Sequence, residues 1–552
     1  MKKIKSKKGV TLITVGIAII IMLILLTTLV YRSTKNTQLQ KLDNLYNDIQ
    51  LLNEKVALYY YKHGALPVAG TYTGDLPPTE TLNPNDNGVY YIIDITALEN
   101  VTLSNNPNIE DNIYIINERS QTIYFPKGVT IDGEAYYRLP ELFAKIMTEA
   151  DIAEELERLE EEERRNNFIF IMDIPDNNRT YQLGMGWSAI VDLTIDWGDG
   201  QSSTVTAYND VNRAHTYANA GIYTIKISGV ASNAFWFQHE QRLISIISGF
   251  PENMCPNVTS LASTFWNCTN LTSIPEGLFA NCPNVTSFDS VFYQCTNLTS
   301  IPEGLFANCP NVTNFINSFR ECSSLTGSIP EGLFANCPNV ESFAGTFSYC
   351  SNLTNIPEGL FANNTNVTGF EGTFDSCGNL TGSIPEGLFA NCPNVTRFDS
   401  VFAFCGNLTG SIPEGLFANC PDVTDFSGAF KYCYNLTSIP EGLFANCPEV
   451  TWFGEIFTGC RMTSIPEGLF ANCPNVESFS KAFNGTRITS IPEGLFSNCP
   501  NVTDFNGTFY NCLYLGGNAP EIWNMPTVTN YSWCFYQCYG LSNYASIPSG
   551  WK

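Results

Sequence analysis

Histidine and positive charge are scarce in this sequence, and cysteine is absent before Cys255. The three histidines, His63, His215 and His239, lie in separate contexts, so we interpret them as structural. Zinc binding is not expected, because no C-x₂-C pair is present and no histidine lies among the cysteines. No nucleophile–base pair, phosphate-binding loop or metal cluster is apparent, so we expect no enzymatic activity.

The chain carries 28 basic and 53 acidic side chains, a net charge of −25. Of these, 23 acids and 7 bases lie from residue 251 onward, a local charge of −16. A surface this acidic repels phosphate backbones, which argues against nucleic-acid binding. The first nine residues are the exception, with five lysines and no acid.

An uncharged stretch of 22 residues, 10–31, follows these lysines. At about 1.5 Å per residue, a helix of this length spans the ~30 Å hydrocarbon core of a bilayer. The lysines should stay on the cytoplasmic side. We therefore expect a single-pass membrane protein whose later domains are extracellular, at the cell surface. A secretory signal peptide fits poorly, because the apolar run is long and no small-x-small site follows it.

The segment "KKGVTLI" resembles the leader of type IV pilins and type II secretion pseudopilins, cleaved after Gly9 so that Val10 becomes the N-terminus. Position 14 holds Thr14, where these families usually carry a glutamate that neutralises a neighbour's N-terminal amine during assembly. The resemblance therefore implies a minor or tip subunit, assembled with other pilin-like subunits. A plain membrane anchor is the alternative.

Residues 34–63 continue the pseudopilin resemblance. Apolar residues recur at spacings of three and four from Leu39 to Tyr59, which predicts an amphipathic helix ending in "YYYKHGALP". Strand-like runs at 90–101 and 112–128, the second a hairpin, suit a small α+β head. Residues 144–167 are helix-forming and highly charged, which predicts a solvated helical linker.

Residues 168–230 alternate in short strand-like runs separated by polar turns, as in a β-sandwich. The segments "DWGDG" (196–200) and "HTYANAGIYTIKISG" (215–229) resemble the PKD domain, an immunoglobulin-like extracellular module. We expect Trp197 in the core and turn hydrogen bonds from Asp196 and Asp199. Calcium binding at these carboxylates is the alternative, although Ca²⁺ takes six or more oxygens. No other cofactor is expected.

The C-terminal part is repetitive: "IPEGLF" occurs nine times at spacings of 26 to 28 residues. A fixed period of this size marks a solenoid. Each period divides into two similar halves, each with a short strand and a helical corner, and about ten coils are expected. Single inserted glycines, Gly327, Gly382 and Gly410, lengthen three intervals and should form local bulges.

The glutamate of each motif recurs at one place in successive coils, so nine carboxylates should line one edge of the solenoid. At about 5 Å apart in water, neighbours repel by only about 1 kcal/mol. We interpret this glutamate edge as solvated, with cation binding as the alternative. Its members are Glu276, Glu303, Glu331, Glu358, Glu386, Glu414, Glu441, Glu467 and Glu493.

The 20 cysteines form two ladders, one in each half-repeat, in which Asn364 and Thr486 each replace one member. Stacked coils place successive thiols near disulfide range. The polar replacements argue against obligate pairing, so we interpret the cysteines as mostly reduced packing residues. Disulfide formation stays open as the alternative.

The motifs "LTSIPEGLF" and "VTSFDSVFYQC" are similar to the BspA-type leucine-rich repeats of bacterial surface proteins. This resemblance implies adhesion to a protein or glycan of a host or neighbouring cell. Within the chain, "IPEGLFANC" barely changes, whereas the pair between Phe and Cys in the other half-repeat changes freely. Exposed aromatics on a rigid face suit partner contacts; drift on an idle surface is the alternative. The candidate residues are Tyr293, Arg320, Tyr349, Phe404, Tyr432, Trp452 and Tyr510.

The sequence thus predicts a multidomain, non-enzymatic adhesin or interaction protein displayed by a pilin-like helix. The alternatives are a structural pseudopilus subunit of a secretion or DNA-uptake system, and a simply membrane-anchored repeat protein. A carbohydrate-processing enzyme would need an opposed pair of differently tuned carboxylates, which equally spaced glutamates do not provide. The predicted order is a leader at 1–9, a transmembrane helix at 10–31, a pseudopilin-like helix and head at 32–143, a linker at 144–167, a PKD-like sandwich at 168–230 and the repeats at 243–552.

Overall fold

The computed structural model describes residues 33–98, 100–104, 113–131, 134–139, 149–185, 191–231, 235–255 and 257–552. It divides into two compact units, Met1–Glu161 and Glu162–Lys552, each described by itself. The predicted leader, Gly9, Val10, Thr14 and the helix at 10–31 lie outside the described residues. Within the described part, no helix is long and apolar enough to cross a membrane.

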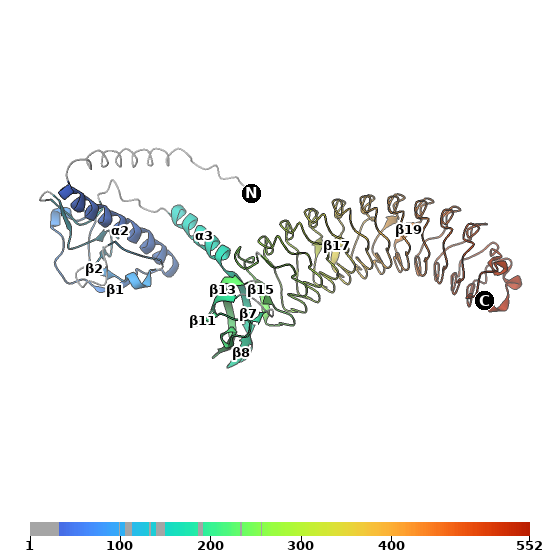
Figure 1. Cartoon of the computed structure of the whole chain (residues 1–552), viewed down its shortest axis with the longest axis horizontal. Helices are drawn as coiled ribbons and strands as arrows, with labels where there is room; N and C mark the ends of the chain where they lie inside the picture. Colours follow the sequence, from blue (N-terminus) through green and yellow to red (C-terminus); the bar gives the residue numbers. More distant parts are fainter. Residues whose placement is uncertain are drawn as a thin grey trace. The chain divides into compact units, whose positions relative to one another are not determined.

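In the first unit, helix α2 (Ser33–His63) packs on a small antiparallel sheet (Figure 1). Its buried face consists of Leu45, Ile49, Leu52 and Val56, whose spacing of three and four residues follows the helical period. The helix ends at Gly64, where φ is +67° and the backbone N–H donates to the Tyr60 carbonyl at 2.8 Å. The amphipathic helix expected from the sequence is therefore present.

The sheet of this unit has the order β1-β2-β3-β4. A buried carboxylate holds it near the helix, because Asp48 of α2 accepts hydrogen bonds from the Tyr114 hydroxyl (2.8 Å) and the Ser104 backbone N–H (2.7 Å). The expected hairpin is β3–β4. The strands are β1 (Val68–Thr71), β2 (Tyr90–Ile93), β3 (Ile115–Asn117), β4 (Ile123–Tyr124) and the separate pair β5 (Val129–Ile131) and β6 (Glu134–Tyr136), with 3-10 turns η1 (Thr79–Thr81) and η2 (Ile95–Ala97).

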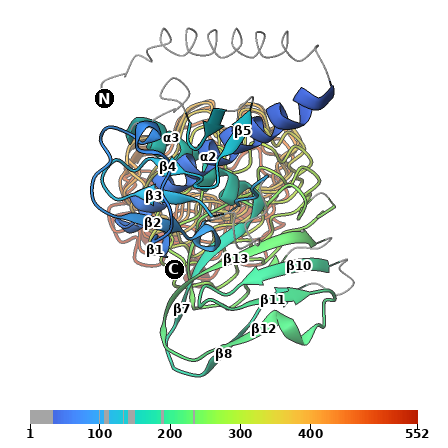
Figure 2. The same cartoon turned by 90° about the vertical axis from the view of Figure 1, so that its left-hand side faces the viewer.

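Helix α3 (Glu149–Asn166), which falls within the predicted linker, precedes the sheets of the second unit. The larger sheet is five-stranded and antiparallel, in the order β11-β10-β13-β7-β15, and Figure 2 shows β10, β11 and β13 lying side by side. Its strands are β7 (Phe168–Ile174), β10 (Val191–Asp196), β11 (Ser202–Val205), β13 (Gly221–Ala231) and β15 (Leu243–Ile246). Two-stranded pairs join β8 (Arg179–Gln182) to β12 (Ala214–Tyr217) and β9 (Gly184–Met185) to β14 (Phe235–Trp236), with η3 (Val211–Arg213) before β12.

The "DWGDG" turn has the local bonds expected from its sequence. Trp197 is buried, and its indole N–H donates to Ser203 Oγ at 2.9 Å. Asp196 accepts the Gly198 N–H (2.9 Å), and Asp199 accepts the Gln201 N–H (3.1 Å). These bonds shape the tight turn that follows β10.

Strand β15 joins the sheet to the repeats. It pairs antiparallel with β7 on one side, while Ser245 forms a parallel bridge with Ser273 of the first coil. The buried apolar core is accordingly continuous from Phe168 to Trp551. Strand β15 thus has backbone partners on both sides, which covers this edge of the sheet.

The repeats stack as coils of a leucine-rich-repeat-type fold (Figure 1). Equivalent phenylalanines of successive coils lie nearly parallel: the Phe288 and Phe315 rings are 5.7 Å apart and the Phe292 and Phe319 rings 5.5 Å. The corners are turns rather than the helical corners expected, as where the Leu278 N–H bonds the Pro275 carbonyl at 3.3 Å. Turns suffice because each corner is too short for a stable helix.

Regular strands in the repeats are short, and three further 3-10 turns close the C-terminal end. Two parallel pairs join β16 (Gly327–Ser328) to β17 (Leu353–Asn355) and β18 (Gly410–Ser411) to β19 (Leu436–Ser438), with register shifts at Gly327 and Gly410 where bulges were expected. At Gly327 φ is +80°, a conformation that glycine adopts without strain. The terminal turns are η4 (Ile522–Asn524), η5 (Tyr544–Ser546) and η6 (Ser549–Trp551).

Candidate functional site

Each coil carries a ten-residue segment, which we call the variable loop, in the half-repeat that lacks "IPEGLF". The loop begins at a residue that forms a parallel bridge to an adjacent coil and ends one residue after the cysteine position of that half-repeat. Backbone hydrogen bonds fasten each loop to the next coil; the Asn317 N–H bonds the Ala344 carbonyl (2.9 Å) and the Phe319 N–H the Thr346 carbonyl (2.9 Å). Variable side chains are thus presented on a paired backbone. Successive parallel bridges join the first residues of the loops: Ser260, Ser287, Asn314, Ser342, Gly369, Arg397, Asp425, Trp452, Ser478, Asp504 and Asn530.

Every variable loop contains left-handed backbone. The residue before the cysteine position has φ near +60° in Tyr349 (61°), Phe404 (59°) and Tyr432 (57°). Gly459 and Gly485 fill the same place in two later loops, and the remaining loops carry Asn, Gln, Glu or Ser there. A left-handed conformation costs a non-glycine residue roughly 1–2 kcal/mol. These three aromatic rings are therefore held where glycine would be easier.

The seven candidate residues from the sequence all lie in variable loops, but their exposure differs. Tyr349, Phe404 and Trp452 are 46%, 45% and 46% exposed, and the other four are half-buried. Their neighbours are mostly one coil away. The contacts are Tyr293 Oη to Glu321 Oε1 at 3.1 Å, Arg320 Cζ over the Tyr349 ring at 5.4 Å, Phe404 beside Tyr432 with ring centroids 4.9 Å apart, and Tyr510 beside Tyr536 with centroids 5.1 Å apart.

Positive charge in the repeats is concentrated in the variable loops. They contain six of the seven basic residues after position 250 and eight of the 23 acids, so the rest of the repeats has one base and 15 acids. The loops are therefore nearly neutral while the remaining surface is strongly acidic. A partner that meets the loops avoids most of the repulsion from the surrounding surface.

Ion pairs tie some of these charges together. Glu455 pairs with both Lys431 and Lys481, the latter at 3.1 Å; burial opposes ionisation of Glu455, but the two lysines lower its pKa overall. Arg397 contacts Asp399 at 3.0 Å and Glu371 at 3.6 Å. Burial raises the pKa of Glu371, whose Oε2 has no hydrogen-bond partner among the described residues.

Three residues near these pairs were not among the sequence candidates: Tyr434, Arg461 and Arg487. All three are exposed, and they occupy equivalent places, directly after the cysteine position, in three successive loops. Arg461 Cζ lies 5.5 Å from the Tyr434 ring centroid. The two 26-residue spacings between "IPEGLF" motifs mark the coils that contain these arginines, and this signal was available in the sequence.

The glutamate edge lies outside the variable loops. Glu276, Glu386 and Glu493 are exposed, as are the other six members. The side chain of Glu414 lies over the next coil, since a Cβ at Gly442 would be 3.2 Å from its Oε1. Among the described residues, no group of three or more His, Cys, Asp or Glu side chains could hold a metal ion.

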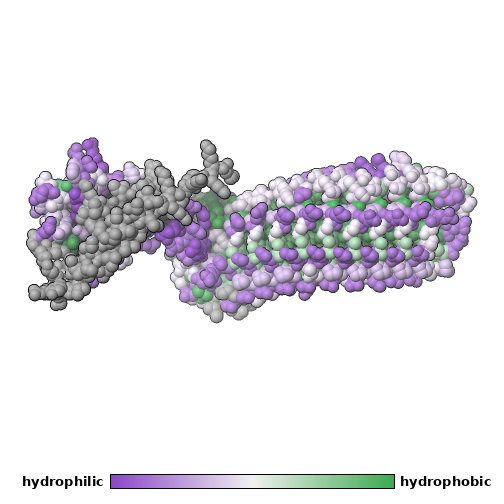
Figure 3. All heavy atoms as spheres, turned by 90° about the horizontal axis from the view of Figure 1, so that it is seen from above, coloured by the Kyte–Doolittle hydropathy of each residue, from purple (hydrophilic) through white to green (hydrophobic). Residues whose placement is uncertain are grey.

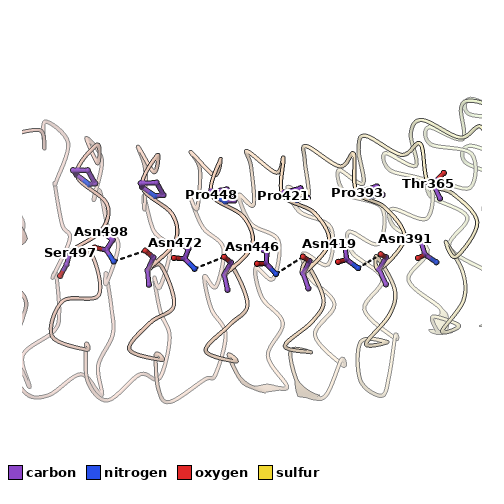
Figure 4. Close-up of a pocket in the computed structure, with 16 residues that line it drawn as sticks. Thr365, Asn391, Pro393, Asn419, Pro421, Asn446, Pro448, Asn472, Ser497 and Asn498 are labelled. Carbon is purple, nitrogen blue, oxygen red and sulfur yellow. Dashed lines mark hydrogen bonds between the residues drawn. The ribbon is translucent and has the colours of Figure 1, made fainter.

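A long groove, the constant groove, follows the repeated "ANCP" residues from Thr365 to Pro500 and has a volume of about 1410 Å³ (Figure 4). Its asparagines are already used for stacking: Asn419 Nδ2 donates to the Ala390 carbonyl (2.8 Å) and Asn446 Nδ2 to the Ala418 carbonyl (3.1 Å). The amide N–H groups of the groove are therefore engaged within the stack. Its regularity agrees with the parallel hydrophilic and hydrophobic stripes along the repeats in Figure 3.

All 20 cysteines are buried and carry free thiols. Those of the variable loops donate to a phenylalanine carbonyl of the preceding coil, as Cys350 Sγ does to Phe319 (2.9 Å) and Cys377 Sγ to Phe347 (3.0 Å). Burial raises the pKa of Cys337 and of Cys460 to about 12. Thiols held neutral by burial, as these two are, suit a packing role, because a thiol with so high a pKa is not a ready nucleophile.

The three histidines have structural contacts. His215 Nε2 lies 2.7 Å from Asp199 Oδ2, with its ring stacked on Trp197 (centroids 5.1 Å apart). His63 Nδ1 lies 2.9 Å from the Tyr59 carbonyl at the end of α2. His239 Nδ1 lies 2.8 Å from Asn267 Nδ2.

The similarity to a known protein family lies in the repeats. Residues 252–451 and 382–519 match the family model described as a BspA type leucine-rich repeat region of six copies. No curated protein matches the sequence.

Several solved structures are also similar. A leucine-rich cell surface protein from Faecalibacterium prausnitzii is 23% identical over 52% of this chain and 76% of its own, with a TM-score of 0.26. A TDR receptor is 16% identical over 52% of this chain and 53% of its own, with a TM-score of 0.32. A chain of the Drosophila Toll–Spatzle complex is 18% identical over 43% of this chain, with a TM-score of 0.21, and the match spans only 38% of that chain. On the family match and the stacked coils, residues 252–519 of this chain form a BspA-type leucine-rich repeat region.

Proposed function

We propose that this chain is a non-enzymatic cell-surface interaction protein, an adhesin, that binds a protein or glycan partner through its variable loops. The BspA-type repeats and the similarity to a bacterial leucine-rich cell surface protein support a surface interaction role. The paired backbone of the loops presents side chains in fixed positions, so little ordering entropy is lost on binding.

The observation that carries this proposal is the left-handed backbone of Tyr349, Phe404 and Tyr432. Other loops carry glycine, asparagine, serine, glutamine or glutamate at the equivalent left-handed position, so the stacked coils do not require an aromatic side chain there. Gly459 and Gly485 occupy equivalent places, so glycine is compatible with the stacked coils. Aromatic side chains kept at a backbone cost, with Phe404 and Tyr349 nearly half exposed, favour a role in contacts with a partner.

For display we propose a membrane-embedded helix at 10–31 with a pilin-like leader cut after Gly9, and a PKD-like module between the head and the repeats. The amphipathic α2 on its small sheet supports the pilin-like part, and Thr14 favours a minor or tip position over the fibre shaft. Mass spectrometry of the mature N-terminus tests this proposal. A chain that begins at Val10 supports processing, whereas an intact leader leaves only the plain anchor.

Adhesion is tested by binding of the full-length chain to an array of extracellular and cell-surface proteins and glycans. The test variant replaces Tyr349, Phe404 and Tyr432 by glycine, which keeps the left-handed backbone and should fold as the wild type does. The matched control replaces Tyr514 by glycine, because Tyr514 is 62% exposed but lies outside the variable loops. We expect the triple variant to lose binding and the control to retain it; equal binding by all three proteins would contradict the proposal.

A further inference from the structure

Four consecutive variable loops differ from the other loops in charge. Loops 397–406, 425–434, 452–461 and 478–487 contain five basic and three acidic residues, a net charge of +2 in a chain of net charge −25. The five earlier loops contain one base and four acids, and the two later loops contain one acid and no base. This is the single positive section of the repeats, and it attracts an anionic group locally.

Two arginines supply the charge that remains free. Lys431 and Lys481 pair with Glu455, and Arg397 pairs with Asp399. In the part of the chain that the structure describes, neither Arg461 nor Arg487 forms an ion pair. Both are exposed and occupy equivalent positions in adjacent coils. Two like charges on neighbouring coils repel unless an anion lies between or over them, and guanidinium groups bind carboxylate or sulfate-like oxygens with paired N–H donors.

The two arginine-bearing coils share a second feature. The segments "CRMTSIPEG" (460–468) and "TRITSIPEG" (486–494) are one residue shorter after the cysteine position than "CYNLTSIPEG" (433–442). The spacing between motifs falls to 26 residues at these two coils. Both adjacent coils thus have the same shortened turn and the same exposed arginine, which favours a shared role over independent drift.

Aromatic rings lie beside the arginines. The ring centroids of Phe404 and Tyr432 are 4.9 Å apart, and those of Tyr432 and Tyr434 are 5.8 Å apart. Two glycines of neighbouring coils leave room for these rings: a Cβ at Gly459 would lie 2.3 Å from Tyr432 Cδ1, and a Cβ at Gly406 would lie 3.0 Å from Tyr434 Cδ2. The three rings, tilted by 42° and 39° from one to the next, form a ring platform across adjacent coils, next to the guanidinium group of Arg461. Lys431 Nζ lies 5.8 Å from the Phe404 ring centroid, so the platform carries positive charge at this end as well.

We propose that the ring platform and the two arginines bind an anionic glycan, with sugar rings against Phe404, Tyr432 and Tyr434 and carboxylate or sulfate groups at Arg461 and Arg487. This inference rests on the proposed function and names the partner class. Apolar faces of sugars suit flat aromatic rings, and acidic substituents suit the arginines. An extended peptide finds less support here, because backbone groups along these loops are already bonded to adjacent coils, as the Tyr432 N–H is to the Thr458 carbonyl (2.7 Å).

The test is isothermal titration of the full-length chain with three hexasaccharides of equal length: a heparin-derived sulfated one, an oligogalacturonate and neutral maltohexaose. We expect at least one acidic hexasaccharide to bind, more weakly as salt rises, and the neutral one to bind at least tenfold more weakly. The two acidic probes distinguish sulfate from carboxylate recognition.

Two sets of variants complete the test. Arg461→Gln with Arg487→Gln should lower affinity for the acidic hexasaccharide by roughly tenfold or more. Lys552→Gln is the matched control: Lys552 also lies over a tyrosine ring, that of Tyr544 at 5.1 Å, but is outside the variable loops, and its removal should leave the affinity unchanged. Far-ultraviolet circular dichroism and thermal melting check that all variants are folded.

The inference is overturned if neither acidic hexasaccharide binds, if maltohexaose binds equally well, or if the Arg461/Arg487 variant binds like the wild type. If the inference is overturned but the glycine triple variant loses the binding that the wild type shows to a protein on the array, the proposed function stands and only the assignment of an anionic glycan as the partner is wrong. If that variant loses nothing, both proposals fail.

Discussion

Asn364 offers a sharp test of how the coils pack, because it replaces one cysteine of a buried ladder. Its side chain is fully buried, and Nδ2 donates to the Cys337 carbonyl (2.8 Å) and the Phe334 carbonyl (3.3 Å). Its Oδ1 has no hydrogen-bond partner among the described residues. A buried oxygen left unpaired costs about 1–3 kcal/mol, whereas each hydrogen bond contributes a net of about 0.5–1.5 kcal/mol.

We predict that Asn364→Cys leaves the free energy of unfolding unchanged or raises it by up to about 1 kcal/mol, because the cost relieved and the two bonds lost are of similar size and the new thiol adds one bond. The substitution removes the unpaired oxygen and loses the two amide bonds, but the new thiol can reach the Phe334 carbonyl, as Cys337 Sγ reaches the Phe306 carbonyl at 3.7 Å in the preceding coil. The assay is urea unfolding of the full-length chain under reducing conditions, monitored by circular dichroism. The free energies of unfolding are compared using one m-value, the dependence on urea concentration, for all proteins.

Thr486→Cys is the matched control, since Thr486 is the polar member of the other ladder. Its hydroxyl already donates to the Phe483 carbonyl at 2.8 Å and lies 3.4 Å from Cys512 Sγ, so no unpaired group is relieved. We expect its effect to be destabilising or within about 0.5 kcal/mol of zero. If Asn364→Cys were destabilising, or no better than Thr486→Cys, the reasoning about the unpaired oxygen would be refuted.

Three further predictions concern titration and thiol reactivity. Burial raises the pKa of Glu371 above its ordinary 4.5, so Glu371→Gln should increase the free energy of unfolding at pH 7, and this gain should vanish below about pH 4.5; a gain that persists at pH 3 would contradict the cause. The pKa of Glu455 is lowered by Lys431 and Lys481 against the effect of burial, so Glu455→Gln should destabilise at pH 7, and the loss should disappear as pH falls below 4.5 through the lowered pKa. Because burial raises the pKa of thiols such as Cys337 to about 12, native protein should resist iodoacetamide at pH 8, whereas unfolded protein should label at all 20 cysteines; rapid native labelling would show that the ladders open.

The repeats were predictable because one physical requirement recurs in every coil. The period of "IPEGLF" indicated stacking, and the structure joins residues 27 apart, such as Ser287 and Asn314, in parallel bridges. The buried face of α2 followed from the spacing of Leu45, Ile49 and Leu52. In each case a short apolar pattern has only one way to exclude water.

Other features depend on relations between coils that the linear pattern does not express. The left-handed backbone of Phe404 follows from hydrogen bonds to the neighbouring coil, not from its own propensity, which favours other conformations. Comparison of copies did indicate Phe404 and Tyr432 as variable, but it did not indicate Tyr434, Arg461 or Arg487. Those three lie just beyond the compared pair, and only the stacking shows that Tyr434 and Arg461 adjoin the same rings.

The most direct test of the central claim is one binding measurement on the Phe404→Gly variant. Glycine adopts the φ of +59° without the backbone strain that Phe404 has there. The free energy of unfolding of the variant should therefore lie within about 1 kcal/mol of the wild-type value. We predict that this variant nevertheless loses most binding to the partner that the wild-type chain captures on the array. A folded Phe404→Gly variant that binds this partner as tightly as the wild type would contradict the claim that the variable loops are the binding face.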